Sequence, residues 1–183
     1  MYSVGNEQLL EQKPLAIYCS RQIPLSVYQQ ALELVQNLMA QQITLAGGWQ
    51  SSLEKEALNL RKPGSSSNII YFLAKGIQNF KLSKSMRVDL DRGKLLVVSL
   101  WMHKERIDKQ KVKDRDNLIL DKLERFLFLH IGEGGNLEEL FYRCLSSGKE
   151  VYLFDHAANH SWFNQEVVPV SKENITKDGI FFH

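Results

Sequence analysis

The chain has 183 residues, a length typical of one domain that buries its own hydrophobic core. Hydrophobic residues make up 44% of it and charged residues 24%, a composition that excludes wholesale disorder and fibrous classes. With 23 Lys and Arg against 21 Asp and Glu, the net charge of +2 selects no class of partner.

Short apolar runs alternate along the chain with stretches in which apolar residues recur every three or four positions. The short runs are typical of buried strands and the recurring pattern of amphipathic helices. The sequence predicts strands at 15–19, 43–46, 69–73, 95–99, 126–131 and 151–154. It predicts helices at 25–41, 51–60, 83–90, 117–124 and 137–146, with Ser52 as a cap of the second helix.

Continuous apolar strands separated by helices are what a parallel sheet covered on both faces requires. We therefore expect an α/β protein with a Rossmann-like, doubly wound, mostly parallel sheet of about six strands and helices on both faces. Residues 1–13 are expected to be an N-terminal extension and residues 14–183 a single domain.

The N-terminus and the cysteines indicate where the protein works. Residues 1–13 carry Glu and Gln where a secretory signal needs a basic end and an apolar run. No apolar run approaches the roughly 20 residues that span a bilayer. Cys19 and Cys144 lie too far apart for a disulfide framework or a zinc ribbon. We expect a cytoplasmic protein without membrane contact, its two cysteines reduced and buried.

Residues suited to anion binding follow three of the predicted strands. They form the turns 19–22 (Cys-Ser-Arg-Gln), 46–51 (Ala-Gly-Gly-Trp-Gln-Ser) and 132–136 (Gly-Glu-Gly-Gly-Asn). Ligands of open parallel sheets bind beyond the carboxyl ends of the strands, where helix N-termini present N–H groups. Each turn alone is better explained as a tight structural turn. Together they predict a single electropositive pocket in which backbone amides converge with two guanidinium groups.

Basic and aromatic residues near the same edge extend this hypothesis. The stretch from Lys104 to Arg115 holds six bases and three acids, and we interpret it as a loop that either attracts phosphate or is merely solvated. Trp49, Trp101 and Trp162 follow strands and could either stack on bases or pack in the interior.

The chain offers weak signals for metal binding. His156 and His160 stand four positions apart beside Asp155, but no third ligand has matching spacing. We therefore expect no metal and no cofactor.

Several segments, taken in order, resemble the DNA-processing protein A (Smf/DprA) family. Residues 17–21 (Ile-Tyr-Cys-Ser-Arg) resemble its Gly-Ser-Arg turn, and residues 45–48 (Leu-Ala-Gly-Gly) its Ser-Gly-Gly-Ala segment. Further segments that resemble the family lie at 71–77, 93–99, 115–119, 134–137 and 168–175. The resemblance covers roughly residues 14–176.

This resemblance implies a protein that binds single-stranded DNA or another phosphate-bearing nucleotide and acts in DNA processing, uptake or recombination. It also implies delivery of the DNA to a RecA-type recombinase, often by a homodimer. No catalysis is required. The expected ligand-binding residues are Ser20, Arg21, Gly47, Gly48, Trp49, Lys111, Lys113, Arg115, Gly134, Gly135 and Asn136.

Residues 131–139 (Ile-Gly-Glu-Gly-Gly-Asn-Leu-Glu-Glu) are also similar to the Pro-Gly-Gly-x-Gly-Thr-x-x-Glu loop of the LOG proteins of the same superfamily. These enzymes cleave the glycosidic bond of nucleoside monophosphates. The similarity implies that Arg115 anchors the phosphate while Glu139 stabilises the developing positive charge on the sugar or activates water. A nucleotide-sensing module without turnover is a third possibility.

Overall fold

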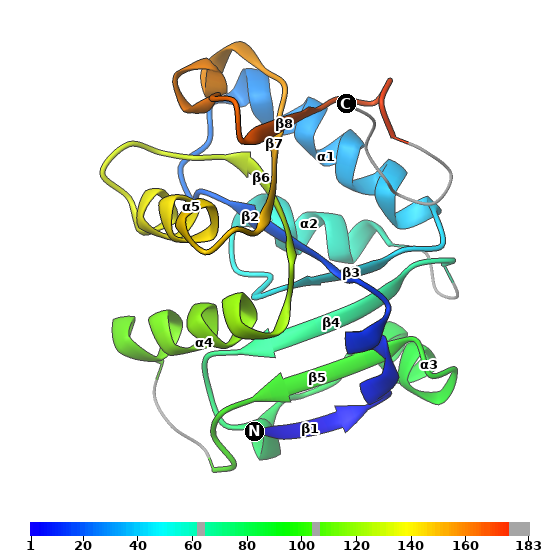
Figure 1. The fold of residues 1–183 in the computed structure, drawn as a ribbon. Coiled ribbons are helices and arrows are strands. Elements are labelled where there is room, and N and C mark those ends of the chain that lie inside the picture. The colour runs from blue at the N-terminus through cyan, green and yellow to red at the C-terminus, as the bar shows by residue number, and fades with distance from the viewer. Residues whose placement is uncertain (62–64, 104–106, 176–183) are drawn as a thin grey trace.

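The computed structural model describes residues 1–61, 65–103 and 107–175, and eight strands of this part form one sheet. The strands are β1 (Tyr2–Gly5), β2 (Leu15–Cys19), β3 (Thr44–Gly47), β4 (Asn68–Leu73), β5 (Leu95–Ser99), β6 (Arg125–His130), β7 (Glu150–Phe154) and β8 (Val167–Val170). Their order in the sheet is β1-β5-β4-β3-β2-β6-β7-β8 (Figure 1). Neighbouring strands are parallel throughout, except that β1 runs antiparallel to β5.

The helices cover both faces of this sheet. They are α1 (Leu25–Ala40), α2 (Ser52–Leu60), α3 (Lys84–Asp91), α4 (Lys109–Lys122) and α5 (Asn136–Ser146), with short 3-10 helices η1 (Glu7–Glu11), η2 (Ile77–Asn79) and η3 (Ala157–Trp162). Helices α1, α2 and α3 lie on one face of the sheet, and α4 and α5 lie on the other (Figure 1). Side chains of the first three helices pack in one hydrophobic core, and side chains of α4 and α5 pack in a second. The predicted Rossmann-like α/β class is confirmed.

The sheet has two strands more than predicted, and both lie at its edges. β1 is mostly exposed, so it lacks the continuous apolar run of a buried strand. β8 contains Pro169, whose missing N–H is tolerated on an edge strand. Residues 1–13 thus contribute β1 to the sheet, and η1 places Leu9 in the core.

Helix α4 begins eight residues before the predicted start at residue 117. Its first turn is capped by Asp108, whose carboxylate accepts a hydrogen bond of 2.8 Å from the Lys111 N–H. The first half of this helix is polar except for Val112, so apolar periodicity does not reveal it. The basic residues of 109–115 therefore lie on a helix, not on a loop, while Lys104 and Arg106 lie outside the described residues.

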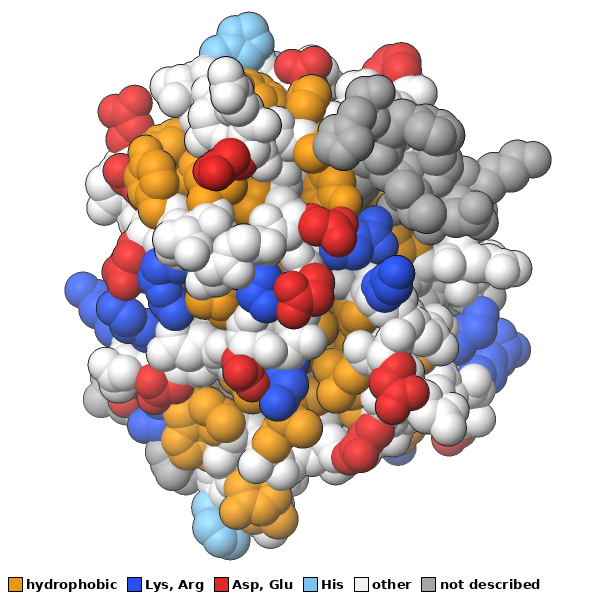
Figure 2. Space-filling view, in the orientation of Figure 1, with side chains coloured by type: hydrophobic (Ala, Val, Ile, Leu, Met, Phe, Trp, Pro, Cys, Tyr) orange, Lys and Arg blue, Asp and Glu red, His pale blue; other side chains and the backbone are white. Residues whose placement is uncertain are grey.

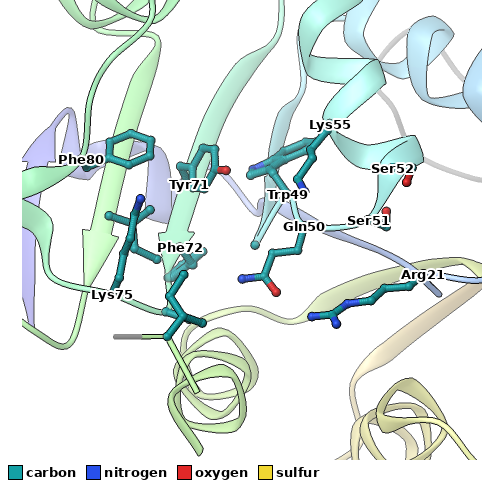
Figure 3. A pocket seen from close by; sticks show the side chains of 14 residues that line it. Arg21, Trp49, Gln50, Ser51, Ser52, Lys55, Tyr71, Phe72, Lys75 and Phe80 are labelled. Atoms are coloured by element: carbon teal, nitrogen blue, oxygen red, sulfur yellow. The ribbon is translucent and has the colours of Figure 1, made fainter. Parts of the chain in front are cut away.

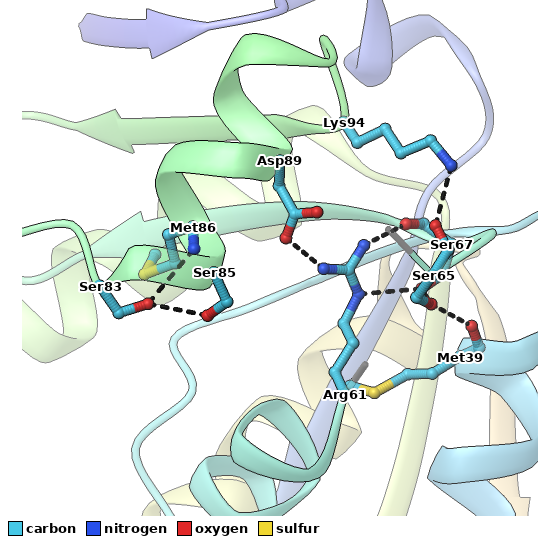
Figure 4. Close-up of polar contacts among 9 residues, drawn as sticks. All are labelled: Met39, Arg61, Ser65, Ser67, Ser83, Ser85, Met86, Asp89 and Lys94. Carbon is cyan, nitrogen blue, oxygen red and sulfur yellow. Dashed lines mark hydrogen bonds and ion pairs between the residues drawn. The ribbon is translucent and has the colours of Figure 1, made fainter. Parts of the chain in front are cut away.

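A polar network joins α1, α2, α3 and the starts of β4 and β5 at the amino edge of the sheet (Figure 4). Arg61 forms a buried ion pair with Asp89 of α3 and donates to Ser67. Ser65 donates to the Met39 carbonyl over 2.8 Å. These contacts lie at the edge opposite the predicted ligand site, so we treat them as structural.

Both cysteines are buried and unpaired, as predicted. Burial raises the pKa of the Cys144 thiol to about 12, so this thiol is unreactive at neutral pH. In the parts of the chain that the structure describes, no helix combines the length and the apolar character needed to cross a membrane.

Candidate ligand-binding site

The turns that follow β2, β3 and β6 line one cavity of about 410 Å³, because these strands are neighbours and end at the same edge. We call it the first pocket; its walls include Ser20, Arg21, Gly48, Arg115, Gly132, Gly135 and Asn136. The Ser20 hydroxyl accepts a hydrogen bond of 2.8 Å from the Gly132 N–H, which ties two of the turns together. The predicted convergence of the three turns is therefore observed.

Arg115 extends from α4 over Gly48. A Cβ atom at position 48 would lie 2.2 Å from Nη1 of Arg115, so only glycine leaves room for the guanidinium. Nε and Nη2 of Arg115 donate to one carboxylate oxygen of Asp116 over 3.0 and 2.7 Å. Nη1 is buried and has no hydrogen-bond partner among the described residues. The pocket wall thus holds a buried cation with unused donors.

Several backbone amides expected to bind the ligand are already bonded to carboxylates of the chain itself. Glu54 accepts from the N–H groups of Cys19, Gln50 and Ser51 over 2.9, 2.7 and 3.3 Å. At the third turn, the Gly134 N–H donates to Glu138 over 2.6 Å. This corrects the expectation of free amides, because helix-capping carboxylates supply the anion. Ser51, not Ser52, is the cap of α2.

Three acidic residues, Glu54, Asp116 and Glu133, line the first pocket, and the protein environment disfavours the charged forms of Glu54 and Asp116. Burial raises the pKa of Glu54, although its hydrogen bonds oppose this shift. Burial also raises the pKa of Asp116, with Arg115 acting in the opposite direction. The Tyr18 hydroxyl donates to Asp116 over 3.2 Å. The first pocket therefore combines two arginines with two carboxyls whose charged forms are disfavoured by burial, and with the exposed side chain of Glu133.

A second cavity of about 550 Å³ lies on the other side of the turn after β3. We call it the second pocket; its walls include Trp49, Lys55, Tyr71, Lys75 and Phe80, together with four residues shared with the first pocket, Arg21, Gly48, Gln50 and Ser51 (Figure 3). None of the described residues that line it is acidic. On the face drawn in Figure 2, by contrast, acidic and basic side chains are interspersed.

Trp49 packs in the interior. Its side chain is 1% exposed, and its indole N–H donates to the Ile70 carbonyl over 3.0 Å. Trp162 is also buried, while Lys111 lies over the ring of Trp101 with Nζ 5.9 Å from the centroid. Of the two alternatives for the tryptophans, packing describes Trp49 and Trp162.

The remaining predicted residues do not meet in the first pocket. Lys113 and Glu139 form an ion pair of 2.7 Å and line a separate hollow between α4 and α5. This hydrogen bond from Lys113 lowers the pKa of Glu139. Arg115 and Glu139 therefore line different cavities. Gly47 and Gly134 are absent from the walls of both pockets, and Lys111 pairs with Asp108 over 3.1 Å.

Among the described residues, no three His, Cys, Asp or Glu side chains are grouped so that they could hold a metal ion. His156 instead accepts a hydrogen bond of 3.1 Å from the Ala158 N–H and caps η3.

Lys55, Tyr71, Lys75 and Phe80 of the second pocket, and the role of Glu54, are not among the residues predicted from the sequence. Lys75 comes two positions after β4, so the rule that ligands bind beyond strand ends applies to it as well. The Ser51-x-x-Glu54 spacing is a capping-box pattern, and this signal was in the sequence.

No protein-family model and no curated protein sequence matches the chain. Solved structures with similar folds include DNA processing protein A (DprA) from Streptococcus pneumoniae, with a TM-score of 0.72 and 15% identity over 92% of this chain and 62% of that one. DprA from Helicobacter pylori, described for its single-stranded DNA binding mode, gives a TM-score of 0.67 and 14% identity over 86% of this chain and 73% of that one. The molybdenum cofactor carrier protein of Chlamydomonas reinhardtii gives a TM-score of 0.55 and 12% identity over 87% of this chain and 90% of that one.

The fold is therefore the one shared by DprA and the molybdenum cofactor carrier proteins, as the resemblance to the Smf/DprA–LOG superfamily predicted. The chain spans less than two thirds of the length of the S. pneumoniae protein. Because the neighbours bind different ligands and share few identical residues, the likeness describes the fold and leaves the ligand to be argued from the pockets.

Proposed function

We propose that this chain binds single-stranded DNA, or another phosphate-bearing nucleotide, in the first pocket without transforming it. The observation that carries the proposal is the Arg115 guanidinium, which lies buried against Gly48 with Nη1 unpartnered. A buried donor without an acceptor costs about 1–3 kcal/mol. A phosphate oxygen in the pocket would supply that acceptor.

The two arginines would act differently. Arg115 is held by Asp116 in one orientation, so it would bind a phosphate without first losing conformational freedom. Arg21 is exposed and stands where the two pockets meet. It would attract the ligand and close over it. The fold shared with the single-stranded DNA binder of H. pylori supports DNA as the first choice.

The same proposal includes the roles that the family resemblance implies. The chain would act in the cytoplasm as a homodimer in DNA processing, uptake or recombination, and would deliver its DNA to a RecA-type recombinase. Sedimentation with and without DNA tests the dimer.

No observation favours a nucleotide glycosidase, because Glu139 is bonded to Lys113 away from Arg115. A sensing module would bind a mononucleotide and show no preference for DNA.

A titration of labelled oligothymidylate at two salt concentrations tests the proposal. Because Arg21 is exposed, Arg21→Ala removes a charge without disturbing the core. We expect it to weaken binding at least about tenfold at low salt and less at high salt. Arg92→Ala removes the same charge from an exposed site before β5, at the opposite edge, and should bind as the parent does. Absent or salt-insensitive DNA binding would overturn the proposal.

A further inference from the structure

The second pocket has the chemistry of a nucleotide site of its own. We infer that it holds the nucleotide next in the strand to the one in the first pocket, so that the ligand is a single-stranded oligonucleotide of at least two units. This inference rests on the proposed function, since it requires a nucleotide in the first pocket.

The charges of the second pocket favour a phosphate. Arg21, Lys55 and Lys75 line it, and no described lining residue is acidic to compensate them. Both lysines are at least partly exposed, and neither has an ion-pair partner among the described residues. Neutral hydrogen-bonding groups complete the polar side, with Gln50, Ser51 and Ser52 in the wall. An anion that enters would meet no carboxylate among the described residues of this wall.

The apolar side of the same pocket favours an aromatic ring. Tyr71 and Phe80 are partly exposed and contact each other with ring centroids 5.0 Å apart. Lys75 extends toward Phe80, its Nζ 5.5 Å from the ring centroid (Figure 3). Aromatic side chains beside cations are the combination on which the bases of single strands stack. The volume of about 550 Å³ lies within the roughly 300–1,000 Å³ of small-molecule sites.

The shared wall makes the two pockets neighbours along one strand. Arg21, Gly48, Gln50 and Ser51 line both cavities, so a ligand leaving the first pocket past Arg21 enters the second. A mononucleotide fills one cavity only. A duplex would keep its bases stacked and paired, away from Tyr71 and Phe80. The arrangement therefore fits consecutive unpaired nucleotides.

Calorimetry with three thymidine ligands tests the inference: the 5′-monophosphate, the 5′-phosphorylated dinucleotide, and the same dinucleotide with an abasic second unit. We expect the dinucleotide to bind at least about tenfold more tightly than the monophosphate, because a stacked base and a second phosphate are added. The abasic ligand should fall between them. Lys55→Ala/Lys75→Ala should remove most of the dinucleotide's advantage and leave monophosphate binding unchanged.

The matched control is Arg92→Ala/Lys122→Ala, which removes two exposed charges just before β5 and β6, at the opposite edge. It should retain the full preference for the dinucleotide. Equal binding of monophosphate and dinucleotide by the parent overturns this inference and leaves the first pocket as proposed. If none of the three ligands binds and oligothymidylate also fails, the proposed function is itself overturned.

Discussion

The first and second pockets share a wall but hold their charges differently. In the first pocket, Arg115 and Asp116 are bonded to each other and largely buried, and Glu54 is bonded to three backbone amides. In the second pocket, Lys55 is exposed and Lys75 half-buried, and none of the described residues in its wall is acidic. The charges of Arg115, Asp116 and Glu54 in the first pocket are thus part of the fold, whereas Lys55 and Lys75 of the second pocket have no ion-pair partner among the described residues and are available for a ligand. Substitutions should separate these two roles.

The largest effect is expected from Glu54→Ala. This change removes the acceptor of three backbone N–H groups, one of which belongs to Cys19, 35 residues earlier in the chain. Each buried donor left unpaired costs about 1–3 kcal/mol, so the free energy of unfolding should fall by several kcal/mol in urea. Glu54→Gln keeps one acceptor oxygen, so its free energy of unfolding should fall clearly less. Equal losses for the two variants would show that the hydrogen bonds are not the cause.

The second largest loss of stability is expected from Arg115→Met, which leaves the Asp116 carboxyl buried without its ion pair. Breaking a buried pair from one side costs about 3–5 kcal/mol. Urea unfolding should show this loss, and oligothymidylate binding should fall as well.

The control for this pair is Arg115→Met/Asp116→Leu, which replaces both charges with apolar groups. It should recover most of the stability, because no unpaired charge remains, but none of the DNA affinity. If the single variant were as stable as the parent, the charges of the first pocket would not be structural, and the contrast between the pockets would be lost.

The difference between the pockets also explains what the sequence could predict. The six buried strands were predictable because continuous apolar runs record burial directly. The turn residues Ser20, Arg21 and Gly48 were predictable because parallel strands end at one edge. The contact of Glu54 with Cys19 was not, since it joins residues that only the packing of α2 against β2 brings together.

The start of α4 is a second case in which the sequence could not predict the structure. Its polar first half has no apolar pattern, so the sequence predicts a loop at residues 109–115 and does not predict the residues that they contact. Lys113 faces Glu139 across two helices, and Arg115, two positions on, faces Gly48 instead. Which side of a polar helix points to a site depends on its rotation, which tertiary packing alone fixes.

A smaller effect on stability is expected in the second pocket. Lys55→Ala/Lys75→Ala should change the free energy of unfolding by no more than about 0.5 kcal/mol, as is usual for surface positions. Binding of oligothymidylate should respond through its salt dependence. The slope of log K against log salt should become shallower by about 1.4, because each phosphate contact of a single strand contributes about 0.7. An unchanged slope would mean that these lysines contact no phosphate.

The smallest effect concerns pH and isolates the buried carboxyl of Glu54. Burial raises its pKa above the ordinary value of 4.5, so in the folded state it keeps its proton to a higher pH than in the unfolded state. The stability that this group contributes is therefore complete below pH 4.5 and is lost as the pH rises through the raised pKa. Glu54→Gln cannot titrate, and every other group is common to both proteins. The difference in unfolding free energy between parent and Glu54→Gln, measured in urea from pH 4 to pH 8, should shift against the parent as the pH increases. A shift in the opposite direction would show that the hydrogen bonds from Cys19, Gln50 and Ser51 outweigh burial, and that Glu54 carries a full negative charge in the wall of the first pocket.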